Sequence, residues 1–157
     1  MIAELVAQRQ IAKLFAAFEA RDVDRLVRFW AEDIVIEFPE GTPMAGEWRG
    51  RAECTAFFKA VFAHNASISI TPLQVAVRGG WSPRGATTYW LEWRVTLVGV
   101  NGHVFEASMV TVAEIRRWRT VRSRDYCFDV PGWAAHYATM EFPPRKAARG
   151  RSASSAA

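Results

Sequence analysis

The sequence predicts an α+β domain in which helices come first along the chain and antiparallel strands follow. Three observations support this prediction. Apolar residues recur at helical spacing in the N-terminal part, and β-branched and aromatic residues dominate from Ser67 onward. Asn101–Gly102 stands between two such runs, and this pair is typical of a tight hairpin turn. Because helical and strand patterns are separated along the chain, we expect helices on one face of the sheet.

Three helices are expected in the N-terminal half. The first runs from about Ala3 to Ala20, and its apolar stripe consists of Ile11, Leu14, Phe15 and Phe18. A short second helix follows Asp22, whose side chain can cap it, and ends near residues 32–33. The third runs from Arg51 to Ala63 and buries Phe57, Phe58, Val61 and Phe62.

Five strands and a closing helical turn complete the predicted elements. A proline at position 72 predicts that its strand lies at a sheet edge or contains a bulge. The expected strands are Ile34–Phe38, Ser67–Val77, Ala86–Val98, His103–Ile115 and Thr120–Val130, and the helical turn covers Trp133–Met140.

Charge is distributed unevenly along the 157 residues, whose formal net charge is +4. Four basic residues lie in the last segment: Arg145, Lys146, Arg149 and Arg151. Without them, the remaining Lys and Arg residues equal the 16 Asp and Glu residues in number. We therefore expect one neutral domain, residues 1–140, and a basic, disordered tail, residues 141–157. Such a tail can keep the protein soluble or touch nucleic acid, and we favour the first alternative.

The remaining composition excludes several classes of protein. No apolar run is long enough to span a membrane, and the N-terminus lacks the apolar core of a signal peptide. Cys54 and Cys127 form no disulfide framework, and His64, His103 and His136 lack metal-ligand spacing. These observations predict a cytoplasmic protein with no membrane partner, no metal and no cofactor.

The strand Thr120–Val130 presents two different faces, because side chains alternate along a strand. One face carries small or acidic residues, namely Val121, Ser123, Asp125, Cys127 and Asp129, and the other carries Arg122, Arg124, Tyr126 and Phe128. Small side chains leave a hollow, and Asp125 is expected to lie in it. A carboxyl group in an apolar hollow has a raised pKa, which suits acid–base chemistry. The alternative is a structural aspartate paired with an arginine.

Three segments resemble the nuclear-transport-factor-2-like superfamily, in particular its SnoaL-like and limonene-epoxide-hydrolase-like group. They are Phe18–Gly41, Gly50–Phe58 and Ser123–Asp129. The resemblance implies a cone-shaped fold, in which three N-terminal helices pack on a curved, mainly antiparallel sheet that encloses a pocket for a small molecule. It also implies that Asp125 and Arg94 match an Asp and an Arg that hold the catalytic water in the epoxide hydrolases. The second Asp of that arrangement falls at Thr96, so the same mechanism is not predicted.

The strand Ala86–Val98 leaves two alternatives open. Its apolar face consists of Tyr89, Leu91, Trp93, Val95 and Leu97, and its polar face includes Trp90, Glu92, Arg94 and Thr96. Periodicity alone buries the apolar face and leaves Arg94 in water. The family resemblance favours the reverse, with Arg94 in the pocket and the apolar face against a second copy of the chain. We adopt the second alternative, which predicts a homodimer formed through the convex face of the sheet.

The resulting hypothesis is a cofactor-free acid–base enzyme that acts on a small, largely apolar cyclic, polyketide-like or terpenoid-like molecule. Asp125 moves the proton, and Arg94 orients Asp125 or stabilises an oxyanion. Cyclisation, isomerisation, dehydration and epoxide opening all fit. The expected substrate-binding residues are Trp30, Phe38, Trp48, Phe58 and Trp90, with Trp48 as a candidate lid. The alternative is a non-catalytic ligand-binding or dimerisation module. The arginines at positions 116–124 are expected to pair with carboxylates on neighbouring strands, namely Glu92, Glu106 and Glu114, rather than with nucleic acid.

Overall fold

The computed structural model describes residues 2–79 and 85–145. Within these residues, a six-stranded sheet has the strand order β2-β1-β6-β5-β4-β3. The strands are Trp30–Phe38 (β1), Gly46–Arg49 (β2), Asn65–Arg78 (β3), Ala86–Gly99 (β4), Val104–Arg116 (β5) and Arg119–Cys127 (β6). The helices are Ile2–Glu19 (α1), Val23–Leu26 (α2), Arg51–His64 (α3) and Val130–His136 (α4), with a 3₁₀ turn at Val27–Phe29 (η1). The predicted α+β class is confirmed.

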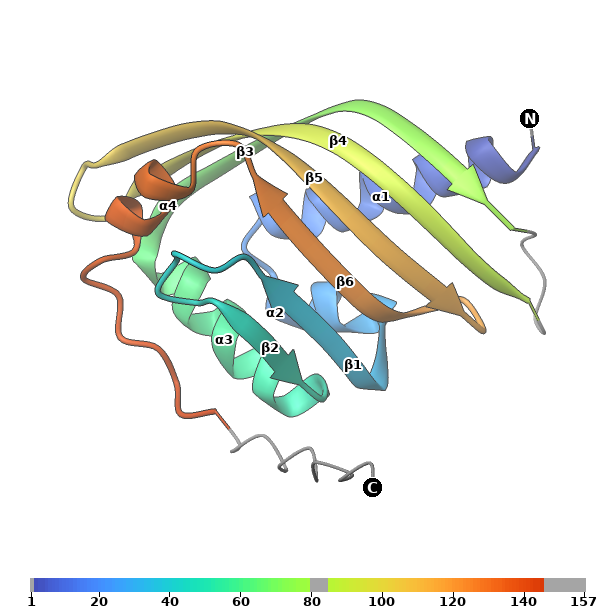
Figure 1. Cartoon of the computed structure of the whole chain (residues 1–157), viewed down its shortest axis with the longest axis horizontal. Helices are drawn as coiled ribbons and strands as arrows, with labels where there is room; N and C mark the ends of the chain where they lie inside the picture. The colour runs from blue at the N-terminus through green and yellow to red at the C-terminus, as the bar shows by residue number, and fades with distance from the viewer. Residues whose placement is uncertain (1, 80–84, 146–157) are drawn as a thin grey trace, which may run out of the picture.

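Helices α1 and α3 cover the same face of the curved sheet (Figure 1). Helix α1 packs against β3, and α3 packs against β1 and β2. Helix α4 lies at one end, beside β5. The apolar core therefore fills the space between α1, α3, α4 and the inner face of the sheet. None of the described helices is long and apolar enough to cross a membrane.

The segment after α1 differs from the prediction in its length. Asp22 caps α2 as expected, since its carboxylate accepts a hydrogen bond of 2.9 Å from the Arg25 amide. The helix ends at Leu26, however, and β1 begins at Trp30. Residue Trp30 pairs with Thr120 of β6, so strand pairing takes residues that helical spacing assigned to α2. The expected loop after β1 also contains strand β2, which pairs with β1 from Val35 to Phe38.

Two predicted features of β3 to β5 are confirmed. Strand β3 lies at one edge of the sheet, and its register with β4 shifts between Pro72 and Gln74. The β4–β5 hairpin turns at Asn101–Gly102, where Gly102 has a φ of 83°. All neighbouring strands are antiparallel except β1 and β6, which are parallel.

Strand β6 contains a bulge that the sequence did not predict. Thr120 pairs with Ile115, whereas Arg122 pairs with Glu114, so Val121 is an extra residue. The bulge brings Thr120 to the same face as Ser123 and Asp125. The strand ends at Cys127, earlier than expected.

Asp129 does not continue the face of Asp125. Its carboxylate caps α4 by accepting a hydrogen bond of 2.9 Å from the amide of Gly132. The expectation that Asp125 and Asp129 share one strand face is wrong, because the chain leaves the sheet between them.

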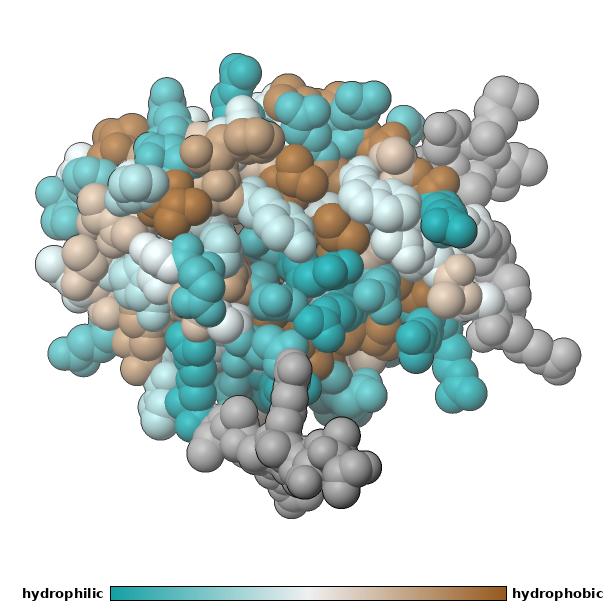
Figure 2. Space-filling model, viewed as in Figure 1, coloured by the Kyte–Doolittle hydropathy of each residue, from teal (hydrophilic) through white to brown (hydrophobic). Residues whose placement is uncertain are grey.

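The outer face of the sheet is open and mixed in character (Figure 2). Hydrophilic residues gather over the part of this face where β6, β1 and β2 lie, with hydrophobic residues scattered around them. Arg122 contacts the carboxylates of Glu37 at 2.6 Å and Glu47 at 3.0 Å. Its partners therefore lie on β1 and β2 instead of the expected β4 and β5. The exposed aromatic residues on or next to this face include Trp90, Tyr126 and Phe128.

The packed part of the chain extends beyond the predicted boundary at residue 140. The Phe142 ring lies 6.1 Å from that of Phe57 and 6.3 Å from that of Trp48. The Arg145 guanidinium lies 4.4 Å from the Trp48 ring and donates to the Ala45 carbonyl oxygen at 2.5 Å. The rest of the predicted tail, residues 146–157, lies outside the described residues.

Candidate functional site

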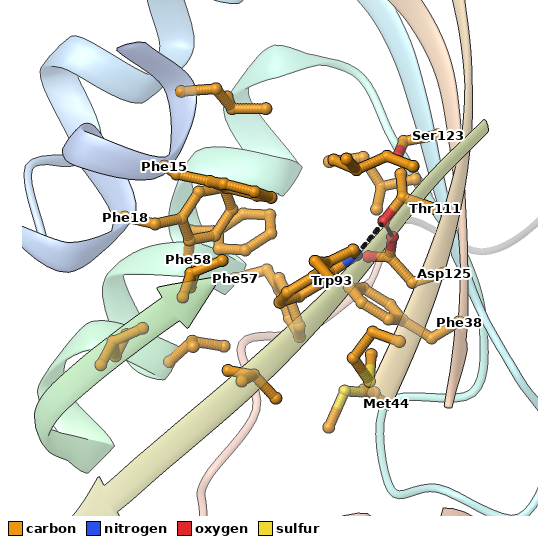
Figure 3. Close-up of a pocket in the computed structure, with 18 of the residues that line it drawn as sticks. Phe15, Phe18, Phe38, Met44, Phe57, Phe58, Trp93, Thr111, Ser123 and Asp125 are labelled. Atoms are coloured by element: carbon orange, nitrogen blue, oxygen red, sulfur yellow. Dashed lines mark hydrogen bonds between the residues drawn. The ribbon is translucent and has the colours of Figure 1, made fainter. Parts of the chain in front are cut away.

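A cavity with a volume of about 120 Å³ lies between the helices and the inner face of the sheet. Figure 3 shows phenylalanines on the helical side and Thr111, Ser123 and Asp125 on the sheet side, with Trp93 between the two groups. Helix α4 contributes Trp133, and Tyr137 follows it. Residues of the helices and of the sheet therefore both line the cavity.

Aromatic residues form a large part of the cavity wall, and the other lining residues are mostly aliphatic. The Phe15 ring lies 5.5 Å from that of Trp93, and the Phe58 ring lies 5.3 Å from Phe18 and 5.4 Å from Trp30. The spacing of three residues between Phe15 and Phe18 places both on one side of α1. Rings at these separations pack favourably and hold one another in place. The wall is thus a rigid apolar surface that fits an apolar molecule.

The polar part of the wall includes a short chain of hydrogen bonds that ends at Asp125, and the hydroxyls of Ser123 and Thr120 lie in the same wall. The Thr111 hydroxyl donates to the Asp125 carboxylate at 2.6 Å, and the Trp93 indole Nε1–H donates to the Thr111 oxygen at 3.0 Å. Thr111 and Asp125 are direct cross-strand partners on β5 and β6. A hydroxyl has one proton to donate, so the Thr111 proton is committed to Asp125. The chain fixes the orientation of the carboxylate toward the cavity.

Burial raises the pKa of Asp125 from 3.8 to about 6, and the hydrogen bond from Thr111 opposes this shift only in part. Among the described residues, no Arg, Lys or His side chain lines the cavity, so no neighbouring cation lowers this pKa. The carboxyl group therefore changes its protonation state just below neutral pH. A group with such a pKa can both take and give a proton at physiological pH.

Three of the expected substrate-binding residues line the cavity, namely Trp30, Phe38 and Phe58. Asp125 lines it as well. The residues that sequence reasoning missed are Thr111, Trp93 and Ser123. Thr111 could have been found from the strand register, which places it opposite Asp125 on β5. The register of β4 with β5 follows from the Asn101–Gly102 turn once the length of the turn is known.

The expected position of Arg94 is wrong. Arg94 is exposed on the outer face of β4, and Trp90, which is 39% exposed, shares that face. The other face of β4, which carries Tyr89, Leu91, Trp93, Val95 and Leu97, lines the cavity. Periodicity alone gave the correct orientation, because burying this apolar face removes the most apolar area from water.

The expectation that Trp48 is a lid over the pocket is also wrong. Trp48 is fully buried outside the cavity lining. Its indole Nε1–H donates to the Met44 carbonyl oxygen at 3.0 Å, and its ring lies 4.5 Å from that of Phe57. Trp48 therefore supports the cavity wall from behind, since both Met44 and Phe57 line the cavity.

A second buried polar cluster lies around His136 at the end of α4. The His136 Nε2–H donates to the Asn65 Oδ1 at 2.8 Å, because the Asn65 amide nitrogen donates to the Val61 carbonyl oxygen. The other ring nitrogen, Nδ1, accepts from the His103 Nδ1–H at 3.1 Å. His64 donates from Nε2 to the His136 carbonyl oxygen at 2.9 Å, so it joins α3 to α4.

Burial, followed by the neighbouring His64 and His103, lowers the pKa of His136 from 6.5 to about 4. The ring is therefore neutral at physiological pH, and both of its nitrogens have partners. Across the described ranges, no group of three or more His, Cys, Asp or Glu side chains is arranged to hold a metal ion. We interpret the His136 cluster as a structural contact between α4, α3 and the β4–β5 turn.

The family model of the SnoaL-like domain matches residues 11–123, and the chain belongs to this family, within the nuclear-transport-factor-2-like superfamily. A search of curated protein sequences finds no match.

Solved structures of this superfamily resemble the chain in fold. A protein of unknown function from Burkholderia pseudomallei is 22% identical, with a TM-score of 0.66 over 79% of this chain and 91% of its own. A putative isomerase from Bacillus subtilis is 27% identical, with a TM-score of 0.63 over 82% of this chain and 91% of its own. A hypothetical protein with a ketosteroid-isomerase-like fold from Catenulispora acidiphila, solved in complex with trimethylamine, is 15% identical, with a TM-score of 0.61 over 74% of this chain and 82% of its own.

Proposed function

We propose that this protein is a cofactor-free enzyme that performs acid–base chemistry on a small, largely apolar molecule, with Asp125 as the group that takes or gives the proton. One observation carries this proposal. The Asp125 carboxyl faces a largely apolar cavity, is oriented by Thr111, and has a pKa near 6. A structural aspartate would be paired with a cation or a backbone amide, and Asp125 has neither partner among the described residues.

The cavity volume limits the size of the substrate to about one ring. An apolar cavity of about 150 Å³ holds a benzene molecule, so about 120 Å³ suits a molecule of similar or smaller size. The aromatic residues of the wall supply the binding energy, and Asp125, held by the hydrogen bond from Thr111, supplies the ionisable group. Dehydration, epoxide opening, isomerisation and cyclisation all require a proton to be moved at such a position.

Turnover of one-ring substrates tests the proposal. The panel is 1-methylcyclohexanol for dehydration, 1-methylcyclohexene oxide for epoxide opening and cyclohex-3-en-1-one for isomerisation, with products measured by gas chromatography. We expect at least one reaction to be catalysed and to slow by about 10²-fold or more in Asp125→Asn. Glu92→Gln, which changes an exposed carboxylate on the outer face of β4, is the matched control and should keep full activity.

The second candidate function is a non-catalytic module that binds a small ligand in the same cavity. The observation that favours it is that Asp125 is the only carboxyl, His or Cys group that lines the cavity among the described residues. The two candidates differ in the panel above. Equal product formation by the wild-type protein and Asp125→Asn, together with ligand binding by both, would favour the module.

We also propose a homodimer formed through the outer face of the sheet. The β4 stripe that was expected to form the interface is buried inside the monomer, so the proposal now rests on Trp90, Tyr126 and Phe128, which are 39%, 47% and 74% exposed. Sedimentation at micromolar concentration should show a dimer. Tyr126→Glu should convert it to a monomer without loss of folded structure.

A further inference from the structure

The cavity contains an acidic group and no basic group among its described lining residues. Asp125 contributes a carboxylate, and no Arg, Lys or His side chain among the described lining residues balances its charge. The salt bridges found in the described part of the chain do not include Asp125. An ionised carboxylate in such surroundings lacks both bulk water and a counter-ion, and both losses are costly. The most favourable way to compensate it is a ligand that brings a positive charge.

The aromatic wall favours the same sign of charge. The faces of Trp and Phe rings carry partial negative charge and attract cations within about 6 Å of the ring centre. Phe15, Phe58, Trp30 and Trp93 line the cavity, and the ring distances of 5.5 Å between Phe15 and Trp93 and 5.4 Å between Phe58 and Trp30 hold the rings in place. A cation in this cavity would face π systems on one side and the carboxylate on the other (Figure 3).

Two hydrogen-bond donors next to Asp125 already have partners. The Thr111 proton is committed to Asp125, and the Trp93 indole proton is committed to Thr111. Other hydroxyls, including that of Ser123, also line the cavity. An anion or an enolate intermediate near Asp125 would be repelled by the ionised carboxylate, and it would find the Thr111 and Trp93 protons already engaged.

We infer that this cavity selects its ligand by charge and favours small organic cations, including a cationic intermediate of the proposed reaction, over neutral molecules and anions of the same size. The inference deepens the proposed function and rests on the same cavity. It divides the candidate reactions into those that pass through a cation, such as dehydration of a tertiary alcohol, and those that pass through an enolate, such as ketone isomerisation. The first group is the one that this cavity stabilises.

A dehydration illustrates how the site would balance charge. Protonated Asp125 gives its proton to the hydroxyl oxygen of the substrate, and the C–O bond breaks as its electron pair leaves with water. The carbocation then lies between the aromatic rings and the Asp125 carboxylate. The carboxylate takes a proton from the adjacent carbon, the electrons of that C–H bond form the double bond, and Asp125 regains its proton. The acid is regenerated, and no other reactant is needed.

Binding of three probes of similar shape tests the inference without turnover. The probes are tetramethylammonium, tert-butyl alcohol and pivalate, titrated into the full-length protein at pH 8 and followed by NMR chemical shifts of the Trp93 and Trp30 indole groups. A desolvated cation–π contact and the ionised carboxylate both favour the cation over a neutral molecule of the same shape. We therefore expect tetramethylammonium to bind at least about tenfold more tightly than tert-butyl alcohol, and pivalate not to bind.

Two further measurements separate cavity binding from surface binding. Asp125→Asn should remove the preference for the cation while leaving the affinity for tert-butyl alcohol unchanged, and Glu92→Gln should change neither. On the unaltered protein, the affinity for tetramethylammonium should fall as the pH decreases through about 6, because Asp125 becomes neutral. This pH dependence is measured on the unaltered protein, so it does not require that a variant folds.

The outcomes distinguish this inference from the proposed function. Equal affinity for the cation and the alcohol, failure of tetramethylammonium to bind, or a cation preference that survives in Asp125→Asn would overturn the charge selectivity. A cation preference without any Asp125-dependent turnover would support the inference and reject the catalytic proposal. Turnover that depends on Asp125, without a preference for the cation, would support the catalytic proposal and reject the charge selectivity.

Discussion

Asp125 is a half-buried ionisable group and His136 a fully buried one, and loss of water around each shifts its pKa toward the neutral form. Their surroundings differ. His136 is 2% exposed and has a hydrogen-bond partner for each ring nitrogen, whereas Asp125 has Thr111 on one side and a cavity on the other. A shifted pKa alone therefore does not mark a functional site. The empty space beside the group, which leaves room for a ligand, separates a candidate catalytic group from a structural one.

The two groups also respond to pH in opposite directions. The folded pKa of Asp125, about 6, lies above its ordinary value of 3.8, so this group adds stability as the pH falls from about 6 to 3.8. The folded pKa of His136, about 4, lies below its ordinary value of 6.5, so this group removes stability as the pH falls from 6.5 to about 4. Each effect is about 3 kcal/mol in size, and they largely cancel between pH 6 and 4.

The largest expected change in the free energy of unfolding comes from removing the His136 ring. His136→Ala removes a buried ring and leaves Asn65 and His103 without their partner, so the free energy of unfolding at pH 8 should fall by about 3–4 kcal/mol. Urea denaturation followed by circular dichroism measures this change. His103→Ala, which removes an exposed ring from the same cluster, should cost less than half as much. A loss below about 1 kcal/mol for His136→Ala would mean that the cluster does not hold α4 in place.

Asp125→Asn should have the opposite sign at pH 8. The change keeps the shape of the side chain but removes a desolvated charge, so the free energy of unfolding should rise by about 1–3 kcal/mol. At pH 4, where Asp125 is protonated in the folded protein, the two proteins should be nearly equal in stability. A large loss of stability at pH 8 that Arg94→Met rescues would contradict this arrangement and restore the ion pair that the sequence suggested.

The same variant should uncover the pH response of His136. Without the opposing contribution of Asp125, the stability of Asp125→Asn should fall by about 3 kcal/mol between pH 6.5 and 4. The wild-type protein should change much less over this range. Parallel pH profiles for the two proteins would show that the opposite effects of Asp125 and His136 do not cancel in the wild type.

Thr111→Val should have a smaller effect on stability, and it tests how Thr111 controls the pKa of Asp125. The hydrogen bond from Thr111 lowers the pKa of Asp125, so its removal should raise this pKa further above 6. The stability at pH 8 should fall by about 1 kcal/mol, because the ionised carboxylate loses its donor. Carbon NMR of the Asp125 carboxyl measures the pKa, and Thr111→Ser, which retains the hydroxyl, is the control that should restore it.

The smallest effect is expected for Arg94→Met. The Arg94 side chain is exposed on the outer face, away from both buried groups, so stability should change by less than about 0.5 kcal/mol. The affinity of the cavity for tetramethylammonium and its alcohol analogue should stay the same. A change in either affinity above about threefold would place Arg94 in contact with the site.

The sequence predicted local features well and long-range contacts poorly. Helical spacing, the Asp22 cap and the Asn101–Gly102 turn each depend on neighbouring residues, and all three are found in the structure. The bulge at Val121 depends on how β6 pairs with β5, which no local pattern specifies. Asp125 was found because small residues around a carboxylate are a local signal.

The remaining errors have physical causes of the same kind. His64, His103 and His136 are far apart in sequence, so their contact could not be predicted from spacing. Arg94 was misplaced because a resemblance to a family was given more weight than the alternation of apolar residues. In this strand the apolar alternation reports the free energy of burial directly, and it gave the correct face.

The parallel pairing of β1 with β6 has a consequence for how the chain folds. Glu37 and Arg122, which join these strands, lie 85 residues apart in sequence. Contacts of such long range are entropically expensive to form, and folds rich in them acquire their structure slowly. During synthesis, β1 can pair with β2 at once, but its other edge stays open until β6 leaves the ribosome. That edge, rich in apolar side chains, is the segment of the nascent chain most exposed to aggregation or to capture by chaperones.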